Sequence, residues 1–366
     1  MKSIYRYGSA VLLSCLMFTA CSGRNAEGQD TIKENVSLAD DFDKYKVIYK
    51  GTEGPGVGKN IVLVASDHEY RSEESLPQLA KILSKRYGFT CTVIFGLDEQ
   101  GYILPGSSDL KGLEVLNSAD LMVLFTRFSH FDSGELQHID SYIQAGKPIL
   151  ALRTSTHAFD KIQDPDFAHY NWNYKGDKTE WKDGFGEYIL GETWVSHYGK
   201  NHHQSSRLVI EKGQEKNPIL KGVKEMWVQS GGYTAEPKGE VIARGEVLNG
   251  MTQNAPADKT KELLPVAWTR TYKLDNGASG RVFTTTHGAS EDLLNDGFRR
   301  MLINASLWAI GMESEISETN NVDLVGPYKP TTFNFNGYKA QVKPADLAGW
   351  DSLIMPGEIV KKEKKK

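Results

Sequence analysis

Residues 60–71 read NIVLVASDHEYR, an apolar run that ends in acids, a histidine and an arginine. The run is rich in β-branched residues and lacks polar alternation, which is typical of a strand buried on both faces of a parallel sheet. The polar residues after it, from Asp67 to Arg71, would then lie at the carboxyl end of that strand. Ligands of open α/β sheets bind at that edge. This stretch therefore predicts both the fold class and the position of the site.

Three further apolar runs end in the same way. Residues 121–126 lead into Arg127, residues 148–152 into Arg153 and His157, and residues 280–285 into His287. Because the carboxyl ends of parallel strands share one edge of a sheet, we expect these side chains to meet in one polar site.

Helical periodicity separates the apolar runs. Residues 73–86, 132–146 and 293–310 carry apolar side chains at helical spacing. Strands that alternate with such helices predict a mostly parallel α/β sheet with helices on both faces. Residues 159–198 are crowded with aromatic residues and show neither period, so they predict an irregular insertion over the sheet edge.

The first residues predict an export signal. Lys2 and Arg6 precede an apolar stretch that is too short to span a bilayer. Residues 18–21, FTAC, are similar to a bacterial lipobox in which Cys21 would be lipidated; the alternative is an ordinary signal peptide with a chance cysteine. We expect a signal over 1–20, a tether over 21–45, an α/β domain over 46–312 and an extension over 313–366. The chain would be an exported lipoprotein at the outer membrane or its periplasmic face.

Charge and cysteine content exclude several classes of protein. The net charge is −4 and becomes −6 once Lys2 and Arg6 leave with the signal, so no nucleic-acid partner is expected. The basic run at 361–366 is predicted to be a solvated tail, and membrane contact is expected through the lipid only. Cys91 is the one cysteine of the predicted domain, which leaves neither a disulfide nor a cysteine-rich zinc site within it.

Several segments together resemble the ThuA-like (trehalose-utilisation) family. They follow the family's order from about residue 59 to 311: KPILALRTSTHAF at 147–159, LGETWVSH at 190–197, NPILKG at 217–222, WVQSGGY at 227–233, LPVAWTR at 264–270, GRVFTTTHG at 280–288 and WAIG at 308–311. Residues 151–153 read Ala-Leu-Arg where the family usually carries Gly-Leu-His.

The resemblance implies a fold similar to class I glutamine amidotransferases, with a flavodoxin-like sheet order. Those enzymes place a nucleophilic cysteine in the turn after a strand, but residues 153–157 contain none, so amidotransferase activity is not expected. The family is linked to trehalose and to sugars oxidised at the 3-position. We therefore expect a carbohydrate-catabolic enzyme, a 3-keto-glycoside hydrolase, lyase or isomerase, that works with a partner sugar oxidoreductase. The alternatives are a non-catalytic sugar-binding lipoprotein and a structural role in a surface complex.

Removal of a proton beside a ketone needs a base and a group that stabilises the enolate. Histidine can supply the base without a large pKa shift, and arginine or a metal ion can stabilise the anion. We expect His157 or His287 to be the base, with Arg153 or Arg127 opposite. The catalytic candidates are His157, His287, Arg153, Asp67, His68 and Glu69. The substrate-binding candidates are Arg127, Tyr70, Trp172, Trp181 and Trp194, since sugars stack on aromatic faces. The alternative is that these groups only bind loop backbone or form a satellite core. Arg71, with Glu73 and Glu74, is expected to form a surface ion pair.

A divalent metal is a further option for the site. His197 and His202, beside His203 and together with Asp67 or Glu69, could hold zinc or manganese. Exposed loop histidines are the alternative interpretation. No nucleotide cofactor is expected.

Overall fold

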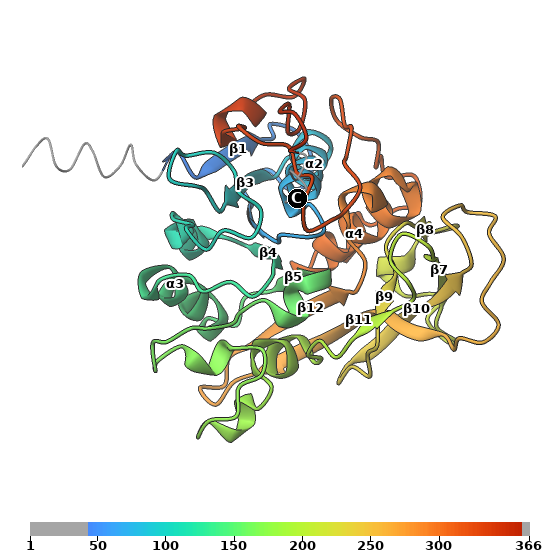
Figure 1. Cartoon of the computed structure of the whole chain (residues 1–366), viewed down its shortest axis with the longest axis horizontal. Helices are drawn as coiled ribbons and strands as arrows, with labels where there is room; N and C mark the ends of the chain where they lie inside the picture. Colours follow the sequence, from blue (N-terminus) through green and yellow to red (C-terminus); the bar gives the residue numbers. More distant parts are fainter. Residues whose placement is uncertain (1–42, 361–366) are drawn as a thin grey trace, which may run out of the picture. The chain divides into compact units, whose positions relative to one another are not determined.

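In the computed structural model, which describes residues 43–360, ten strands form one sheet (Figure 1). Its central strands are parallel and lie in the order β3, β2, β4, β5, β12. Their bounds are Thr90–Phe95, Asn60–Ser66, Leu121–Thr126, Ile149–Leu152 and Ser279–Thr285. Numbered along the chain, this order is the 2-1-3-4-5 arrangement of flavodoxin-like folds. The predicted fold class is confirmed.

Antiparallel strands extend the sheet on both sides of this centre. Strand β1 (Lys46–Lys50) pairs with β3 at one edge. Beyond β12 follow β11 (Leu264–Lys273), β10 (Glu240–Leu248), β7 (Ser205–Ile210) and β8 (Trp227–Val228). A separate ribbon joins β6 (His197–Tyr198) to β9 (Gly232–Tyr233).

The helices cover the sheet as the crossover rule requires. Helix α2 (Ser72–Tyr87) joins β2 to β3, and α3 (Ser133–Gln144) joins β4 to β5 in the opposite direction along the sheet. Because such crossovers are right-handed, the two helices lie on opposite faces. Helix α4 (Asp296–Ala309) packs on β5 and β12. No helix within residues 43–360 is long and apolar enough to cross a membrane.

The segment after α4 runs back along the body to α2 and β1 (Figure 1). The buried Lys81 of α2 donates hydrogen bonds to the carbonyl oxygens of Trp350 and Ser352, at 3.2 and 2.7 Å. The Tyr49 hydroxyl of β1 donates to the Leu347 carbonyl oxygen at 2.8 Å. We call residues 313–360 the C-terminal extension. The predicted signal, Cys21 and nearly all of the predicted tether lie outside the described residues.

Candidate functional site

Three strand-end turns meet at one guanidinium, that of Arg127. Arg127 directly follows β4; its Nε donates to His157 Nε2 at 3.4 Å, and its Nη1 donates to His68 Nε2. Its Nη2 lies 3.9 Å from Glu69 Oε2. Since His68 and Glu69 follow β2 and His157 follows β5, the structure brings together residues that are far apart in sequence, as predicted from the strand ends. Strands β2 and β4 flank the position where the strand order reverses, which is where ligands bind in such sheets.

The two histidines at Arg127 are held neutral. Burial, with Arg127 as the next cause, lowers the pKa of His157 well below its usual value and also lowers the pKa of His68. Since arginine can only donate, His157 Nε2 must be the unprotonated nitrogen, and Nδ1 carries the proton toward Thr156 Oγ1 at 3.3 Å. The two imidazoles are thus neutral acceptors that do not repel Arg127, and its positive charge can stabilise a developing anion.

Glu69 is the buried acid of this group. Its side chain is largely shielded from solvent, and Oε2 has no hydrogen-bond partner. Burial raises the pKa of the carboxyl above its usual value, although Arg153 acts in the opposite direction. A carboxylate with a raised pKa and a free oxygen is suited to accept a proton.

Arg153 lies beneath the group between two tyrosine rings. Its guanidinium is 3.7 Å from the centroid of Tyr70 and 4.9 Å from that of Tyr233. Nη1 donates to the carbonyl oxygens of Gly231 and Thr286, both at 2.6 Å, while Nε and Nη2 have no partner. Arg153 is fully buried, so it serves as a fixed positive charge under the site.

Each of the three turns also contains a residue with a strained backbone conformation. Arg71 after β2, Phe128 after β4 and Arg153 after β5 have φ angles of 65°, 49° and 47°. Non-glycine residues in this left-handed region cost about 1–3 kcal/mol each and cluster at functional sites. The surrounding fold therefore stabilises three unfavourable turns at the edge where the polar side chains meet.

Two predicted catalytic residues have other partners. Asp67 accepts hydrogen bonds from the backbone N–H groups of Glu69 and Tyr70 and, at 2.9 Å, from Thr154 Oγ1, so it fixes the turn. His287 Nε2 lies 3.3 Å from Ser206 Oγ, and its Nδ1 has no partner. Arg71 and Glu73 do form the predicted ion pair, at 3.2 Å, but its predicted position at the surface was wrong, because both side chains are buried; Arg71 lies in the left-handed turn after β2.

The aromatic candidates divide into two groups. Trp194 packs on His157 and Trp172, with ring centroids 5.2 and 6.0 Å apart, and Phe128 packs on His157 at 4.8 Å. Trp181 instead lies in the core of the insertion against Tyr170 and Tyr188. The structure thus places Trp172 and Trp194, but not Trp181, beside the polar group.

The described residues do not fit a metal ion. Between residues 43 and 360, no group of three or more His, Cys, Asp or Glu side chains is arranged to hold one. His197 packs against Trp194 and Tyr233, while His202 stacks on Phe333 with centroids 4.4 Å apart. The two histidines have separate aromatic partners and, among the described residues, belong to no common group of metal ligands.

Sequence reasoning missed three residues of the site. Phe128 and Tyr233 contact His157, and Phe335 of the C-terminal extension contacts both His68 and Arg127. Phe128 could have been found because it adjoins Arg127, and Tyr233 because it lies in a family segment. Phe335 has no local signal, since the chain returns to the site there from a distant segment.

Several buried polar atoms in and around the site have no hydrogen-bond partner. Besides Glu69 Oε2 and the two nitrogens of Arg153, they include Trp194 Nε1 and the Tyr233 hydroxyl. Buried polar groups are nearly always paired in folded proteins, so each exception calls for an explanation such as a catalytic role or a bound group. A polyhydroxylated substrate could supply the missing partners.

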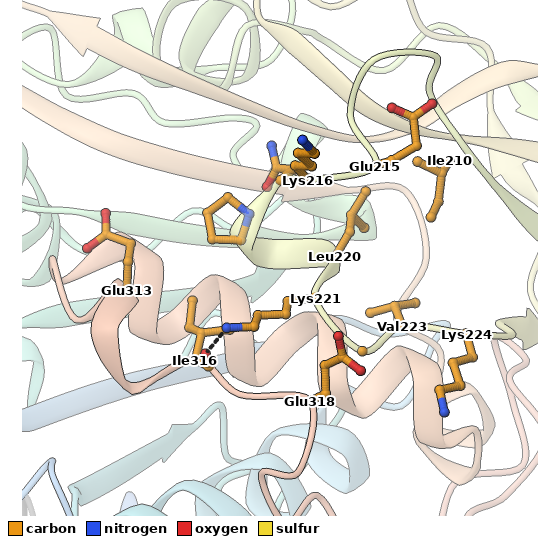
Figure 2. A pocket seen from close by; sticks show the side chains of 13 residues that line it. Ile210, Glu215, Lys216, Leu220, Lys221, Val223, Lys224, Glu313, Ile316 and Glu318 are labelled. Atoms are coloured by element: carbon orange, nitrogen blue, oxygen red, sulfur yellow. Dashed lines mark hydrogen bonds between the residues drawn. The ribbon is translucent and has the colours of Figure 1, made fainter.

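A separate cavity of about 550 Å³ lies beside the start of the C-terminal extension (Figure 2). Lys221 crosses it and donates to the Ile316 carbonyl oxygen at 3.0 Å. Its lining combines lysines with glutamates: Lys216, Lys221, Lys224, Glu215, Glu313 and Glu318. None of the described residues predicted for the site lines it, and its charges offset one another, so the candidate site remains the group around Arg127.

A family model described as trehalose utilisation, ThuA, matches residues 61–309. The chain belongs to the ThuA family. The resemblance seen in the sequence is confirmed, and membership gives the chain a role related to carbohydrate utilisation. No curated protein sequence gives a significant match.

Solved structures similar to this ThuA protein share little sequence with it. A thua-like protein from Parabacteroides merdae ATCC 43184 is 14% identical with a TM-score of 0.42, and the match covers 75% of this chain and 96% of that one. The N-terminal domain of mmIFT52 is 13% identical with a TM-score of 0.32, covering 69% and 97%. PurLQS from Thermotoga maritima is 12% identical with a TM-score of 0.29, covering 67% and 97%.

Proposed function

We propose that this ThuA protein is an enzyme that releases the aglycone of a 3-keto glycoside by acid–base chemistry. The observation that supports it best is the buried Glu69 carboxyl, with a raised pKa and an unpartnered Oε2 only 3.9 Å from Arg127 Nη2. This places a proton acceptor next to a fixed positive charge. Abstraction of a proton beside a ketone requires that pair of groups.

The proposed reaction gives each of these groups a role. The Glu69 carboxylate takes the proton from C2, and the electron pair of that bond forms the enolate of the C3 ketone. Arg127, with the neutral His157 and His68 as its acceptors, stabilises the enolate oxygen. Return of the electrons breaks the bond from C1 to the aglycone oxygen, which takes the proton from Glu69. The ring is left as an enone, and addition of water completes hydrolysis.

The proposal also includes a partner enzyme and a location for the protein in the cell. A 3-keto glycoside must be made by oxidation of the 3-hydroxyl of a sugar, so a sugar oxidoreductase is the partner we propose. We also propose that the enzyme is exported and held at a bacterial membrane through a lipid on Cys21. Replacement of Cys21 by alanine would release the protein from the membrane fraction.

A sugar-binding lipoprotein without catalytic activity is the second candidate. The partly exposed rings of Trp172 and Trp194, which lie 6.0 Å apart, favour it because such faces bind sugars. It predicts binding of the sugar without turnover.

The test is turnover of 3-keto trehalose and of methyl 3-ketoglucoside by the purified mature chain. Glu69→Gln is expected to lower kcat by about 100-fold or more, the usual contribution of a positioned base. His157→Ala should also lower kcat by orders of magnitude, because Arg127 loses an acceptor. Exposed Glu114→Gln is the matched control.

The pH profile separates a base from a structural residue. Only the carboxylate accepts a proton, so kcat/KM should rise with pH through the raised pKa of Glu69, and this rise should be absent from Glu69→Gln. Unchanged kcat in a folded Glu69→Gln protein would reject Glu69 as the base. Binding without turnover in the wild type would support the second candidate. Loss of turnover with a chelator would show a metal held by other ligands.

A further inference from the structure

The C-terminal extension places one aromatic side chain at the candidate site. The Phe335 ring centroid lies 5.3 Å from that of His68 and 4.9 Å from the Arg127 guanidinium. Half of the Phe335 surface, 50%, is still exposed. An exposed phenylalanine that is fixed on two site residues offers a flat apolar face to a ligand at that site.

The residues beside Phe335 are firmly held. The Asn334 backbone N–H donates to the Glu69 carbonyl oxygen at 2.8 Å, and the Asn334 carbonyl oxygen accepts from Arg71. Phe333 is fully buried and packs on Tyr70 with centroids 5.1 Å apart. Phe335 is therefore positioned by the same turn that positions Glu69.

Aromatic rings from two separate segments of the chain contact the polar group. Arg127 lies over Phe335 of the C-terminal extension and, at 5.0 Å, over Phe128 of the turn after β4. The Phe128 ring also packs on the ring of Trp172, in the aromatic-rich insertion, with centroids 5.6 Å apart. The unpartnered Glu69 oxygen belongs to the same polar group and lies 3.9 Å from Arg127 Nη2.

From this arrangement we infer that Phe335 is a specificity-determining residue that binds the aglycone ring, so that the site selects glycosides of two sugar rings. The inference rests on the proposed function. One ring of the substrate packs on the faces of Phe128 and Trp172, and the second packs on Phe335. The bond between the rings then lies at Arg127 and Glu69. The family match ends at residue 309, so this selectivity belongs to a segment outside it.

The test compares a two-ring substrate with a one-ring substrate. Phe335→Ala should lower kcat/KM for 3-keto trehalose about tenfold, the value of one good aromatic contact, and change that for methyl 3-ketoglucoside less than about twofold. Phe335→Trp should restore the preference. Leu294→Ala is the control, because Leu294 is a large apolar residue that is similarly exposed, at 49%. Equal effects on both substrates, or none, would overturn the inference.

Binding of unoxidised sugars tests the role of Phe335 independently of the proposed reaction. If the wild type turns over neither 3-keto substrate, the proposed function fails, and calorimetric titration with trehalose and methyl glucoside tests the role of Phe335 alone. A selective loss of trehalose binding in Phe335→Ala would support it. Equal binding in both proteins, or no sugar binding in the wild type, would overturn it.

Discussion

At His287, burial determines the charge of a single side chain. The residue is fully buried, and burial together with nearby Arg153 lowers its pKa to about 3. In the unfolded chain the pKa of a histidine is about 6.5. Between these two values the unfolded chain binds a proton that the folded chain does not, so the folded state loses stability as pH falls through that window.

We predict that the free energy of unfolding falls by up to about 1.4 kcal/mol per pH unit through His287 alone, between about pH 6 and pH 4. His287→Asn should be less stable at pH 7 but should lose stability less steeply with acid. Denaturant unfolding at pH 7, 6, 5 and 4 measures both slopes, with the exposed His203→Asn as control. Parallel curves for the wild type and His287→Asn would contradict the prediction.

Single residues also show where sequence reasoning ends. His68, Glu69, Arg127 and His157 were predicted to meet because each follows a strand of the parallel sheet, and the structure brings them into contact. The partners that determine what each group does could not be predicted. The oxygens of Asp67, for example, are taken up by hydrogen bonds within the turn and to Thr154.

At the scale of the elements, the turn after β5 supports the turn after β2. The Thr154 hydroxyl donates to Asp67 Oδ2 at 2.9 Å, and both residues are fully buried. Asp67 in turn holds the backbone N–H of Glu69 at 2.9 Å. The position of the proposed base therefore depends, through Asp67, on Thr154, which is 87 positions from Asp67 in the chain.

Thr154→Val keeps the shape of the side chain but removes its hydroxyl. It should destabilise the fold by about 1–3 kcal/mol, because a buried carboxylate loses its donor, and should lower kcat about tenfold with KM little changed, since Glu69 is less well placed. Exposed Thr319→Val provides the comparison in both unfolding and kinetic measurements. A loss of stability with unchanged kcat would limit Thr154 to a structural role.

The bounds of some helices and strands were predicted more accurately than those of others. The bounds of β2, β3 and β4 agree with the apolar runs because those strands are buried on both faces. Helix α4 begins at Asp296 rather than at the predicted Leu293, since the Asn295 side chain caps it by accepting from the Phe298 N–H at 3.0 Å. The strand pairing beyond β12 joins segments with no shared local pattern.

At the scale of the whole described body, Glu74 holds the C-terminal extension through hydrogen bonds and an ion pair. Its carboxylate accepts from the Thr331 N–H and hydroxyl at 2.6 and 2.8 Å and lies 3.6 Å from Lys339 Nζ. Glu74→Gln should weaken these contacts and so speed tryptic cleavage within residues 313–360. It should also reduce the preference for two-ring substrates, the effect expected of Phe335→Ala. Mass spectrometry of timed digests measures the first effect, with Glu114→Gln as control. Unchanged cleavage and selectivity would show that other contacts hold the extension.

The contact between Arg71 and Asn334 joins residues 263 positions apart, and this separation has a consequence for biosynthesis. A ribosome makes the strands, the turns and Arg127 long before it makes Phe335. The growing chain can thus form the sheet and assemble its polar group before Phe335, the residue proposed to bind the second sugar ring, has been made. A segment translated after the whole α/β domain completes the site, so substrate selectivity is acquired only after the strands and turns that carry the polar group have been made.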